Sequence, residues 1–331
     1  MLPHSLENDP IFEAISPVTS VRLLDQYGAA RSDSPPAISP KTLRSPISSY
    51  LVIDHPGPPP AAIFVLRRRD GMLGLGPLIE QRPIDERMRA LLWTAALDWA
   101  YTQPCTAIQI FTEAGSPDAH CLESLGQRAT TEVLALHRPV TADEAVPWLQ
   151  SHDCRPLPLD QLRTDGTITS LIAETFEGTL DLPEALPWRD IRNLVDEWTT
   201  DSADQLPAEV WMTGPPERPF GLIVTRHRES VRLIEYMGIA RDYRRQGWGR
   251  RLLETVVSET ALHGDQGLEV HVDIRNTPAL ALYLGMEFRI QRRAWLAFQG
   301  HLANTQPTPS DPLLKTHDKQ TPTTHGPDGG P

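Results

Sequence analysis

Residues 233–261 combine two apolar patterns that predict a strand followed by a helix. Leu233 to Ala240 is apolar and β-branched enough to predict a largely buried strand. Further on, apolar residues recur at helical spacing and share one face, with polar residues off it. That face consists of Leu252, Leu253, Val256, Val257 and Ala261. The polar, glycine-bearing segment 244–249 lies between the two elements, so we expect a strand, a tight turn and an amphipathic helix.

A second strand and helix follow. Leu268 to Val272 predicts the strand, and Asn276 is a suitable N-cap for the next helix. Pro278 is tolerated in a first helical turn because its missing N–H has no partner there in any case. Upstream of these, residues 157–226 predict a strand near Leu157–Leu159, helices over Thr167–Thr179 and Trp188–Thr199, and a strand pair over Val210–Met212 and Phe220–Arg226.

The first half of the chain shows a similar order of elements. We expect a hairpin over Ser49–Arg69 around Pro56–Pro58, a strand over Gly71–Ile79, a helix over Asp85–Tyr101, a strand over Ala107–Phe111, a short helix near Asp118–Leu125 and a strand over Ala129–Arg138. The apolar face expected for the long helix consists of Met88, Leu91, Leu92, Ala95 and Trp99. Before residue 49, Ile11 to Tyr27 offers a possible short helix.

The turn at 244–249 has the features of an anion site. The first amides of a helix have no intrahelical partners, and together with the helix dipole they attract phosphate. Gly247 and Gly249 lack Cβ atoms, so a ligand can approach the main chain closely. A Walker loop is excluded because no Gly-Lys-Ser/Thr follows, and the two late glycines do not make a Rossmann fingerprint.

The turn resembles the acetyl-CoA-binding motif of the GNAT N-acetyltransferase superfamily, Arg/Gln-x-x-Gly-x-Gly/Ala. A second family motif, Asn-x-x-Ala-x-x-Leu-Tyr-x-x-x-Gly-Phe, is matched at Asn276, Ala279, Leu282, Tyr283 and Phe288. Glu287 occupies the family's glycine position and a glycine stands at Gly285 instead, so we expect an altered turn there. The resemblance covers residues 157–300 and implies a mixed, mostly antiparallel sheet flanked by helices.

The resemblance also implies roles for individual residues. In this family a neutral amine attacks the thioester of acetyl-CoA directly, without an acyl-enzyme. Tyr283 would donate a proton to the departing sulfur, because a phenol is protonated at neutral pH; packing on an apolar helix face is its alternative role. The residues expected to bind acetyl-CoA are Met237, Gly238, Ile239, Arg244, Arg245, Gln246, Gly247, Trp248, Gly249, Arg250 and Asn276.

The base that deprotonates the amine is less clearly marked. Glu235 is the best candidate, because a carboxylate within an apolar strand requires a polar cavity or a partner. It could instead face solvent or pair with Arg232 or Arg292, and a bulge could turn it either way. His271 is a weaker candidate, and ordered water is a further alternative. The acidic segment 174–181 lies where the family shapes its acceptor pocket, and indicates either a cationic amine or a solvated helix end.

Sliding the chain against itself by 161 positions superposes the two halves. This shift pairs Leu91 with Leu252 and Leu92 with Leu253. It places Pro83, Glu86 and Met88 at the positions of Arg244, Gly247 and Gly249, and Gly74, Gly115 and Leu122 at those of Glu235, Asn276 and Tyr283. The first copy therefore keeps the packing pattern without the binding groups. A tandem with one intact copy is similar in layout to mycothiol synthase-type acetyltransferases and to other GNAT tandems.

Composition narrows the class of protein further. The net charge of −12 argues against a nucleic-acid partner, although Arg241, Arg244, Arg245, Arg250 and Arg251 cluster at the turn. Three scattered cysteines suggest neither a disulfide framework nor a metal site. No signal peptide is visible, and Ala61–Leu66, the longest clean apolar run, is far too short to span a membrane. We therefore expect a cytoplasmic protein.

Together these patterns predict an α/β protein with two GNAT-like domains, at 49–140 and 157–300, joined by a linker at 141–156. Residues 1–48, rich in Pro and Ser, are expected to be mostly disordered, and the polar residues 301–331 are expected to form a disordered tail. The expected function is acetyl transfer from acetyl-CoA, used as a cosubstrate without a metal, to a primary amine of a small molecule or protein. The alternative is a non-catalytic CoA-binding sensor or scaffold; a monomer and a homodimer are both open.

Overall fold

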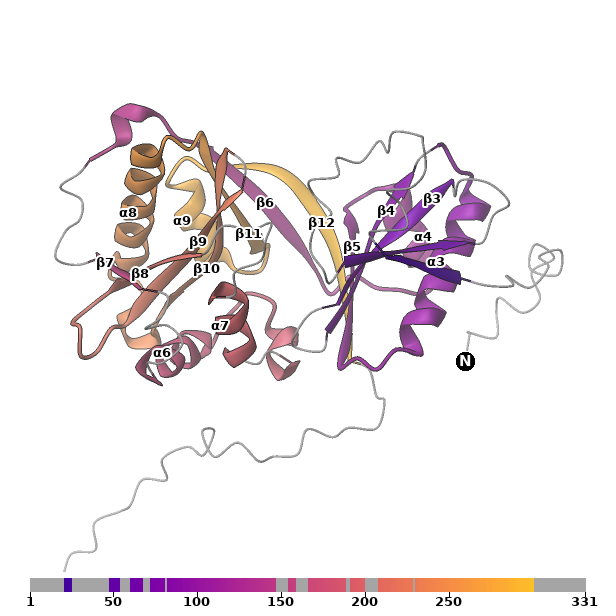
Figure 1. Ribbon diagram of the computed structural model, residues 1–331, viewed down its shortest axis with the longest axis horizontal. Coiled ribbons are helices and arrows are strands. Elements are labelled where there is room, and N and C mark those ends of the chain that lie inside the picture. The colour runs from indigo at the N-terminus through magenta and orange to yellow at the C-terminus, as the bar shows by residue number, and fades with distance from the viewer. Residues whose placement is uncertain are drawn as a thin grey trace, which may run out of the picture. The chain divides into compact units, whose positions relative to one another are not determined.

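A computed structural model describes residues 21–25, 48–53, 60–67, 72–80, 82–146, 154–158, 166–188, 191–199, 208–228 and 230–300. The strands within these ranges form one mixed 12-stranded sheet flanked by helices, in the order β1-β2-β3-β4-β5-β12-β6-β11-β10-β9-β8-β7 (Figure 1). The expected disorder of 301–331 and of most of 1–48 lies outside the described residues. No helix among those described is both long and apolar enough to cross a membrane.

The first copy contains the elements predicted for it. They are β2 (Ser48–Ile53), β3 (Ala61–Arg67), β4 (Met72–Glu80), α3 (Glu86–Tyr101), β5 (Ala107–Glu113), α4 (Pro117–Ser124) and β6 (Thr131–Pro139). The helix expected within 11–27 is wrong where it can be compared, because β1 (Val21–Asp25) is a strand. It pairs antiparallel with β2, so hydrogen bonding to an available sheet edge overrides the weak local helical pattern.

The second copy follows a short connection that holds η2 (Ala142–Glu144). Its elements are β7 (Cys154–Leu157), α6 (Gly166–Phe176), η4 (Pro183–Trp188), α7 (Ile191–Thr199), β8 (Glu209–Thr213), β9 (Gly221–Arg228), β10 (Val231–Ile239), η5 (Arg241–Tyr243), α8 (Trp248–His263), β11 (Gly267–Asp273), α9 (Thr277–Leu284) and β12 (Arg289–Gly300). Strand β7 begins within the expected linker because its residues pair antiparallel with β8.

The two copies exchange their last strands. Strand β6 of the first copy pairs with β11, and β12 of the second copy pairs with β5, while β6 and β12 also pair with each other. All three pairings are antiparallel. The cores follow the exchange: Leu134 and Leu136 of β6 lie in the core under α8, and Trp295 of β12 lies in the core of the first copy. The sequence predicts a separate sheet for each copy, whereas the strands form a single sheet.

In the second part of each copy the structural repeat has a spacing of 160 residues, one less than the sequence comparison indicates. Strands β5 and β11 begin at Ala107 and Gly267, and helices α4 and α9 have N-caps at Ser116 and Asn276. Ser116, and not Gly115, is thus the counterpart of Asn276. At this spacing Glu123 corresponds to Tyr283 and Arg89 to Gly249, in place of Leu122 and Met88.

The buried face of α3 also differs from the expected one. Only Leu92 is common to the two sets, and the observed buried residues are Arg89, Leu92, Trp93, Ala96, Leu97 and Ala100. The helix is rotated by about one residue because Arg89 is drawn inward by carboxylates on β4 and α4. Apolar spacing alone does not separate the two faces, since the observed face is apolar apart from Arg89 and also recurs at helical intervals.

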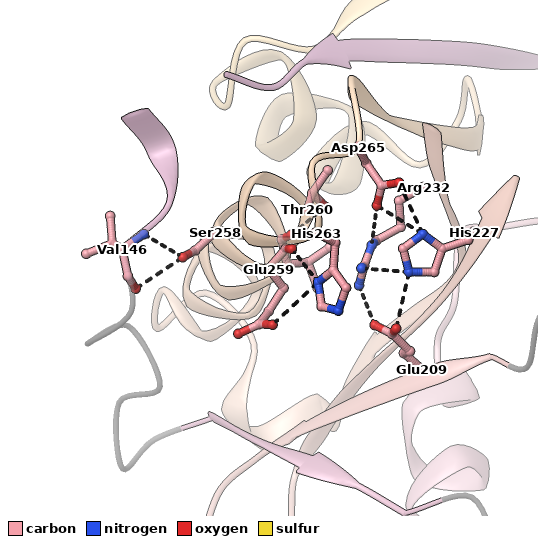
Figure 2. A network of polar contacts seen from close by, with 10 residues as sticks. Val146, Glu209, His227, Arg232, Ser258, Glu259, Thr260, His263 and Asp265 are labelled. Carbon is pink, nitrogen blue, oxygen red and sulfur yellow. Dashed lines mark hydrogen bonds and ion pairs between the residues drawn. The ribbon is translucent and has the colours of Figure 1, made fainter. Parts of the chain in front are cut away.

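A polar cluster fixes the end of α8 to the sheet (Figure 2). Arg232 has no exposed side-chain surface and forms ion pairs with Glu209 and Asp265. His227 lies between the same two carboxylates, with its Nδ1 3.0 Å from Asp265 and its Nε2 3.2 Å from Glu209. A buried charge is tolerated when its partners are this close, and removing one partner leaves the others uncompensated.

We predict that Arg232→Leu lowers the free energy of unfolding by about 3–5 kcal/mol, because two carboxylates lose their buried cation. Urea unfolding followed by circular dichroism measures the loss. Arg228→Leu, at an exposed position of the neighbouring strand, serves as the matched control and should change stability by less than about 0.5 kcal/mol. Equal effects of the two substitutions would show that the buried cluster does not stabilise the fold.

Candidate functional site

Strands β10 and β11 separate in the middle of the sheet. Their parallel pairing runs from Val231↔Gly267 to Ile234↔Val270 and stops there. Beyond that point β10 remains paired with β9 on its other side, as in Met237↔Ile223. A bulge lies between Ile234 and Tyr236, at Glu235, where the sequence analysis raised that alternative. One edge of β10 therefore faces an opening between two strands.

A cavity of about 560 Å³ adjoins this opening. It is bordered by β10, by the start of α8, by the start of α9 and by the segment after α6. Ten of the eleven residues predicted to bind acetyl-CoA line it: Met237, Gly238, Ile239, Arg244, Arg245, Gly247, Trp248, Gly249, Arg250 and Asn276. Gln246 does not line the cavity. Its side-chain amide donates a hydrogen bond to the carbonyl of Asp242 (2.9 Å) and so stabilises the turn itself.

The start of α8 faces the cavity without a side-chain cap. Gly247 is the N-cap residue, has a left-handed φ of 87°, and makes no side-chain cap hydrogen bond. The first main-chain bond of the helix runs from the amide of Arg251 to the carbonyl of Gly247 (3.2 Å). The preceding amides, of Trp248, Gly249 and Arg250, are in the first turn, where an α-helix supplies no acceptor. These donors and the positive end of the helix dipole can bind a phosphate.

The arginines near the turn have different roles. Arg244 donates to the carbonyls of Ile239 (2.9 Å), Thr175 (3.0 Å) and Glu177 (2.8 Å), and so links three segments of the cavity wall. Arg250 donates to the carbonyl of Gly285 (3.1 Å). Beneath the turn, Phe220 stacks on Tyr243 with 4.1 Å between ring centroids and packs edge-on against Trp248. Arg245 is exposed and lines the larger cavity.

A smaller cavity of about 100 Å³ continues from the larger one. Thr175, Thr179, Met237, Asn276 and Ala279 line both. The smaller cavity contains the candidate catalytic side chains, and its other lining residues are Phe176, Asp181, Ile234, Glu235, Tyr236, Val270, His271, Val272 and Tyr283. The expected donor and both candidate bases are therefore brought together at the point where the strands separate.

Glu235 is held by an arginine that the sequence analysis did not consider. Nε of Arg226, on β9, donates to Oε1 of Glu235 at 2.7 Å, and its second nitrogen lies 3.4 Å from Oε2. The side chain of Glu235 is 22% exposed and that of Arg226 only 7%. The proposed partners Arg232 and Arg292 are replaced by Arg226 because the antiparallel register sets Arg226 opposite Leu233, next to the bulge.

The position of Tyr283 fits both of the roles considered for it. It is buried, and its ring lies 5.4 Å from that of Phe288, so it packs in the core under α8. It also lines the smaller cavity. Burial, with Asp181 nearby, raises the pKa of the phenol well above its ordinary value of 10. The hydroxyl is therefore protonated at neutral pH and available as a donor.

A buried carboxylate positions the loop that encloses the smaller cavity. Asp273, at the end of β11, accepts hydrogen bonds from the hydroxyl of Thr131 (2.7 Å) and the amide of Leu182 (3.2 Å). Arg275 donates to both Asp273 (2.6 Å) and Glu184 (2.6 Å). Although burial opposes it, the hydrogen bonds from Arg275 lower the pKa of Asp273. Sequence reasoning missed this group, for which the only local signal is an acid and an arginine two residues apart.

The corresponding place in the first copy is filled. Helix α3 has its own acidic cap, since the carboxylate of Asp85 accepts from the amide of Met88 at 2.7 Å. Arg89, the counterpart of Gly249, forms ion pairs with Glu80 and Asp118 and so bridges β4 and α4. A diphosphate would meet carboxylates there in place of free amides, which agrees with a first copy that lacks the binding groups.

Comparisons with known proteins agree with this geometry. The family model described as "Acetyltransferase (GNAT) family" matches residues 178–288. Residues 178–288 are a GNAT acetyltransferase domain. Their range includes the opening between β10 and β11, the start of α8 and α9, and hence most of both cavities. No curated protein matches the chain by sequence.

Solved structures with the GNAT fold are similar to both the first and the second copy. A GCN5-related N-acetyltransferase from Sphaerobacter thermophilus is 17% identical, with a TM-score of 0.56 over 76% of this chain and 80% of that chain. A tandem GNAT protein from the clavulanic acid biosynthesis pathway is 13% identical, with a TM-score of 0.55 over 88% of this chain and all of that chain (100%). At these identities the likeness concerns the fold, including its tandem form.

Proposed function

We propose that the second copy transfers an acetyl group from acetyl-CoA to a primary amine of a small molecule or protein. The observation that carries this proposal is the uncapped start of α8 beside the open edge of β10. The amides of the first helical turn would bind the diphosphate of CoA. The exposed edge of β10 around Met237–Ile239 would hold the pantetheine arm, and the thioester would reach the smaller cavity.

The reaction would proceed by direct attack. The amine nitrogen forms a bond to the acetyl carbon and loses a proton, while the carbon–sulfur bond breaks and the sulfur gains a proton. A main-chain amide of β10 would stabilise the oxyanion, because the opening leaves that edge of the strand without a partner strand. Tyr283 would donate to the sulfur. No group of three metal-ligating side chains stands close enough to hold a metal ion within the described residues.

Turnover on a panel of amines tests the proposal. Polyamines, amino sugars, amino acids, arylalkylamines and lysine peptides are incubated with acetyl-CoA, and products are detected by mass spectrometry together with free CoA. We expect acetylation of at least one amine class. Binding of acetyl-CoA without transfer to any of them would favour a CoA-binding sensor. A chain that neither binds nor consumes acetyl-CoA would contradict the proposed function.

Tyr283→Phe is predicted to lower kcat by about 10- to 100-fold, the effect of losing one hydrogen bond to a charged atom. The raised pKa of the phenol means that full proton transfer to the sulfur is uphill, so we expect a partial rather than a complete loss. Acetyl-CoA affinity should change by less than about threefold, since the ring and its packing against Phe288 are retained. An unchanged kcat would exclude Tyr283 as the donor.

A further inference from the structure

His271 and Tyr283 approach the smaller cavity from opposite faces of the sheet. Val270 and Val272 on β11 lie in the core under α8, together with Tyr283. Side chains alternate along a strand, so His271 points to the other face. Helix α6 packs on that second face. The neighbouring strand β9 shows this, because Leu222 and Val224 lie in a core with residues of α6, whereas Ile223 between them lies in the core under α8.

His271 is free to act in a way that Glu235 is not. It is the first residue of β11 beyond the last pair with β10, and it lines the smaller cavity. No hydrogen bond joins its imidazole to another described residue. Glu235 lines the same cavity, but its carboxylate is held at both oxygens by Arg226. The oxygens of Glu235 are therefore already engaged, whereas the ring nitrogens of His271 are open to an amine in the cavity.

We propose that His271 is the general base that deprotonates the acceptor amine, with the pair Glu235–Arg226 forming a wall of the acceptor site. This assignment rests on the proposed acetyl transfer and specifies its geometry. The proton leaves the nitrogen toward the α6 face of the sheet, while Tyr283 donates to the sulfur from the α8 face. The base therefore acts on the nitrogen and the acid on the sulfur of the tetrahedral intermediate, each from its own face of the sheet.

The charges around His271 favour its neutral form. Burial lowers the pKa of its imidazole most; Glu269 on β11 raises it, and Arg292 on β12 and Arg228 on β9 lower it, with a net decrease. Glu235 on β10 and Asp181 after α6 are the other ionisable groups that face the same cavity, apart from Tyr283. At pH 7 the ring is therefore unprotonated and can accept a proton.

The pH dependence of kcat/KM tests the assignment. The probe is acetyl-CoA with the panel amine that the wild-type chain acetylates fastest. For the wild type, we expect kcat/KM to fall as the pH is lowered through a pKa below 6.5, the ordinary value for histidine. His271→Gln should lower kcat/KM roughly 100-fold and abolish this acidic limb. Glu235→Gln should keep the limb.

Two further measurements separate a chemical role from a structural one. Calorimetry should give the same acetyl-CoA affinity for His271→Gln as for the wild type, because His271 does not line the larger cavity. Free imidazole should restore part of the rate of His271→Ala. If the wild type turns over and His271→Gln keeps both its rate and its acidic limb, His271 is not the base. If the wild type acetylates no amine, the proposed function itself fails.

Discussion

A chain shortened to residues 154–300 is expected not to fold, although it contains the whole region that matches the GNAT family model. The shortened chain lacks β6, which lies between β11 and β12 in the sheet. It therefore loses two hydrogen-bonded ladders and the core contacts of Leu134 and Leu136. Each buried leucine is worth about 2–5 kcal/mol, and a whole domain is stable by only about 5–15 kcal/mol.

A chain of residues 129–300 is the matched control, because it restores β6 and leaves only the β5 side of β12 unpaired. We expect this longer chain to be soluble, with a cooperative thermal transition by circular dichroism and a well-dispersed NMR spectrum. The 154–300 chain should show neither property. Cooperative unfolding of the shorter chain would contradict the view that the exchanged strand is required by the second copy.

Gly247→Asp is expected to weaken acetyl-CoA binding by about 1,000-fold. The substitution copies the acidic cap that Asp85 gives to α3 in the first copy. The new carboxylate would occupy the free amides and stand within about 4 Å of a bound diphosphate, a repulsion of about 4 kcal/mol near a protein surface. That energy corresponds to about three powers of ten in Kd.

Gly247→Asn separates charge from shape in this experiment. Asparagine has the same size as aspartate, caps helices equally well and tolerates a left-handed φ, which Gly247 has at 87°. We expect Gly247→Asn to weaken acetyl-CoA binding by about 10-fold or less, as measured by competition with a fluorescent CoA analogue. Equal losses for the two variants would show that the effect comes from shape, and that no anion is held at this helix start.

Local patterns in the sequence predict which residues gather around the two cavities, because most of them lie in short motifs. Each of these features is recognised from a segment of about ten residues. This holds for the glycine-bearing turn, for the Asn276 cap and for Tyr283. The side-chain oxygen of Asn276 does accept from the amide of Ala279, as its position before the helix predicts. Glu287 stands where the family has glycine, and it adopts a left-handed φ of 68°. Gly285 has a right-handed backbone with a φ of −69°. The turn therefore keeps, at Glu287, the backbone conformation that favours glycine.

Features that depend on partners distant in the chain could not be read in the same way. Alternation over Thr131–Pro139 predicts a strand, and the strand exists, but nothing in it specifies β11 and β12 as neighbours. Arg226 becomes the partner of Glu235 only through the β9–β10 register and its bulge. The inward turn of Arg89 requires carboxylates on two other elements, which no local pattern around Arg89 indicates.

Calorimetric titration of the wild-type chain with acetyl-CoA and with acetyl-pantetheine, which lacks the diphosphate and the 3′-phosphoadenosine joined to it, tests the central claim most directly. If the uncapped amides of α8 hold the diphosphate, acetyl-CoA should bind with micromolar or tighter affinity and acetyl-pantetheine at least about 100-fold more weakly, a difference of about 2.8 kcal/mol. Absence of acetyl-CoA binding, or equal affinity for the two compounds, would contradict the account.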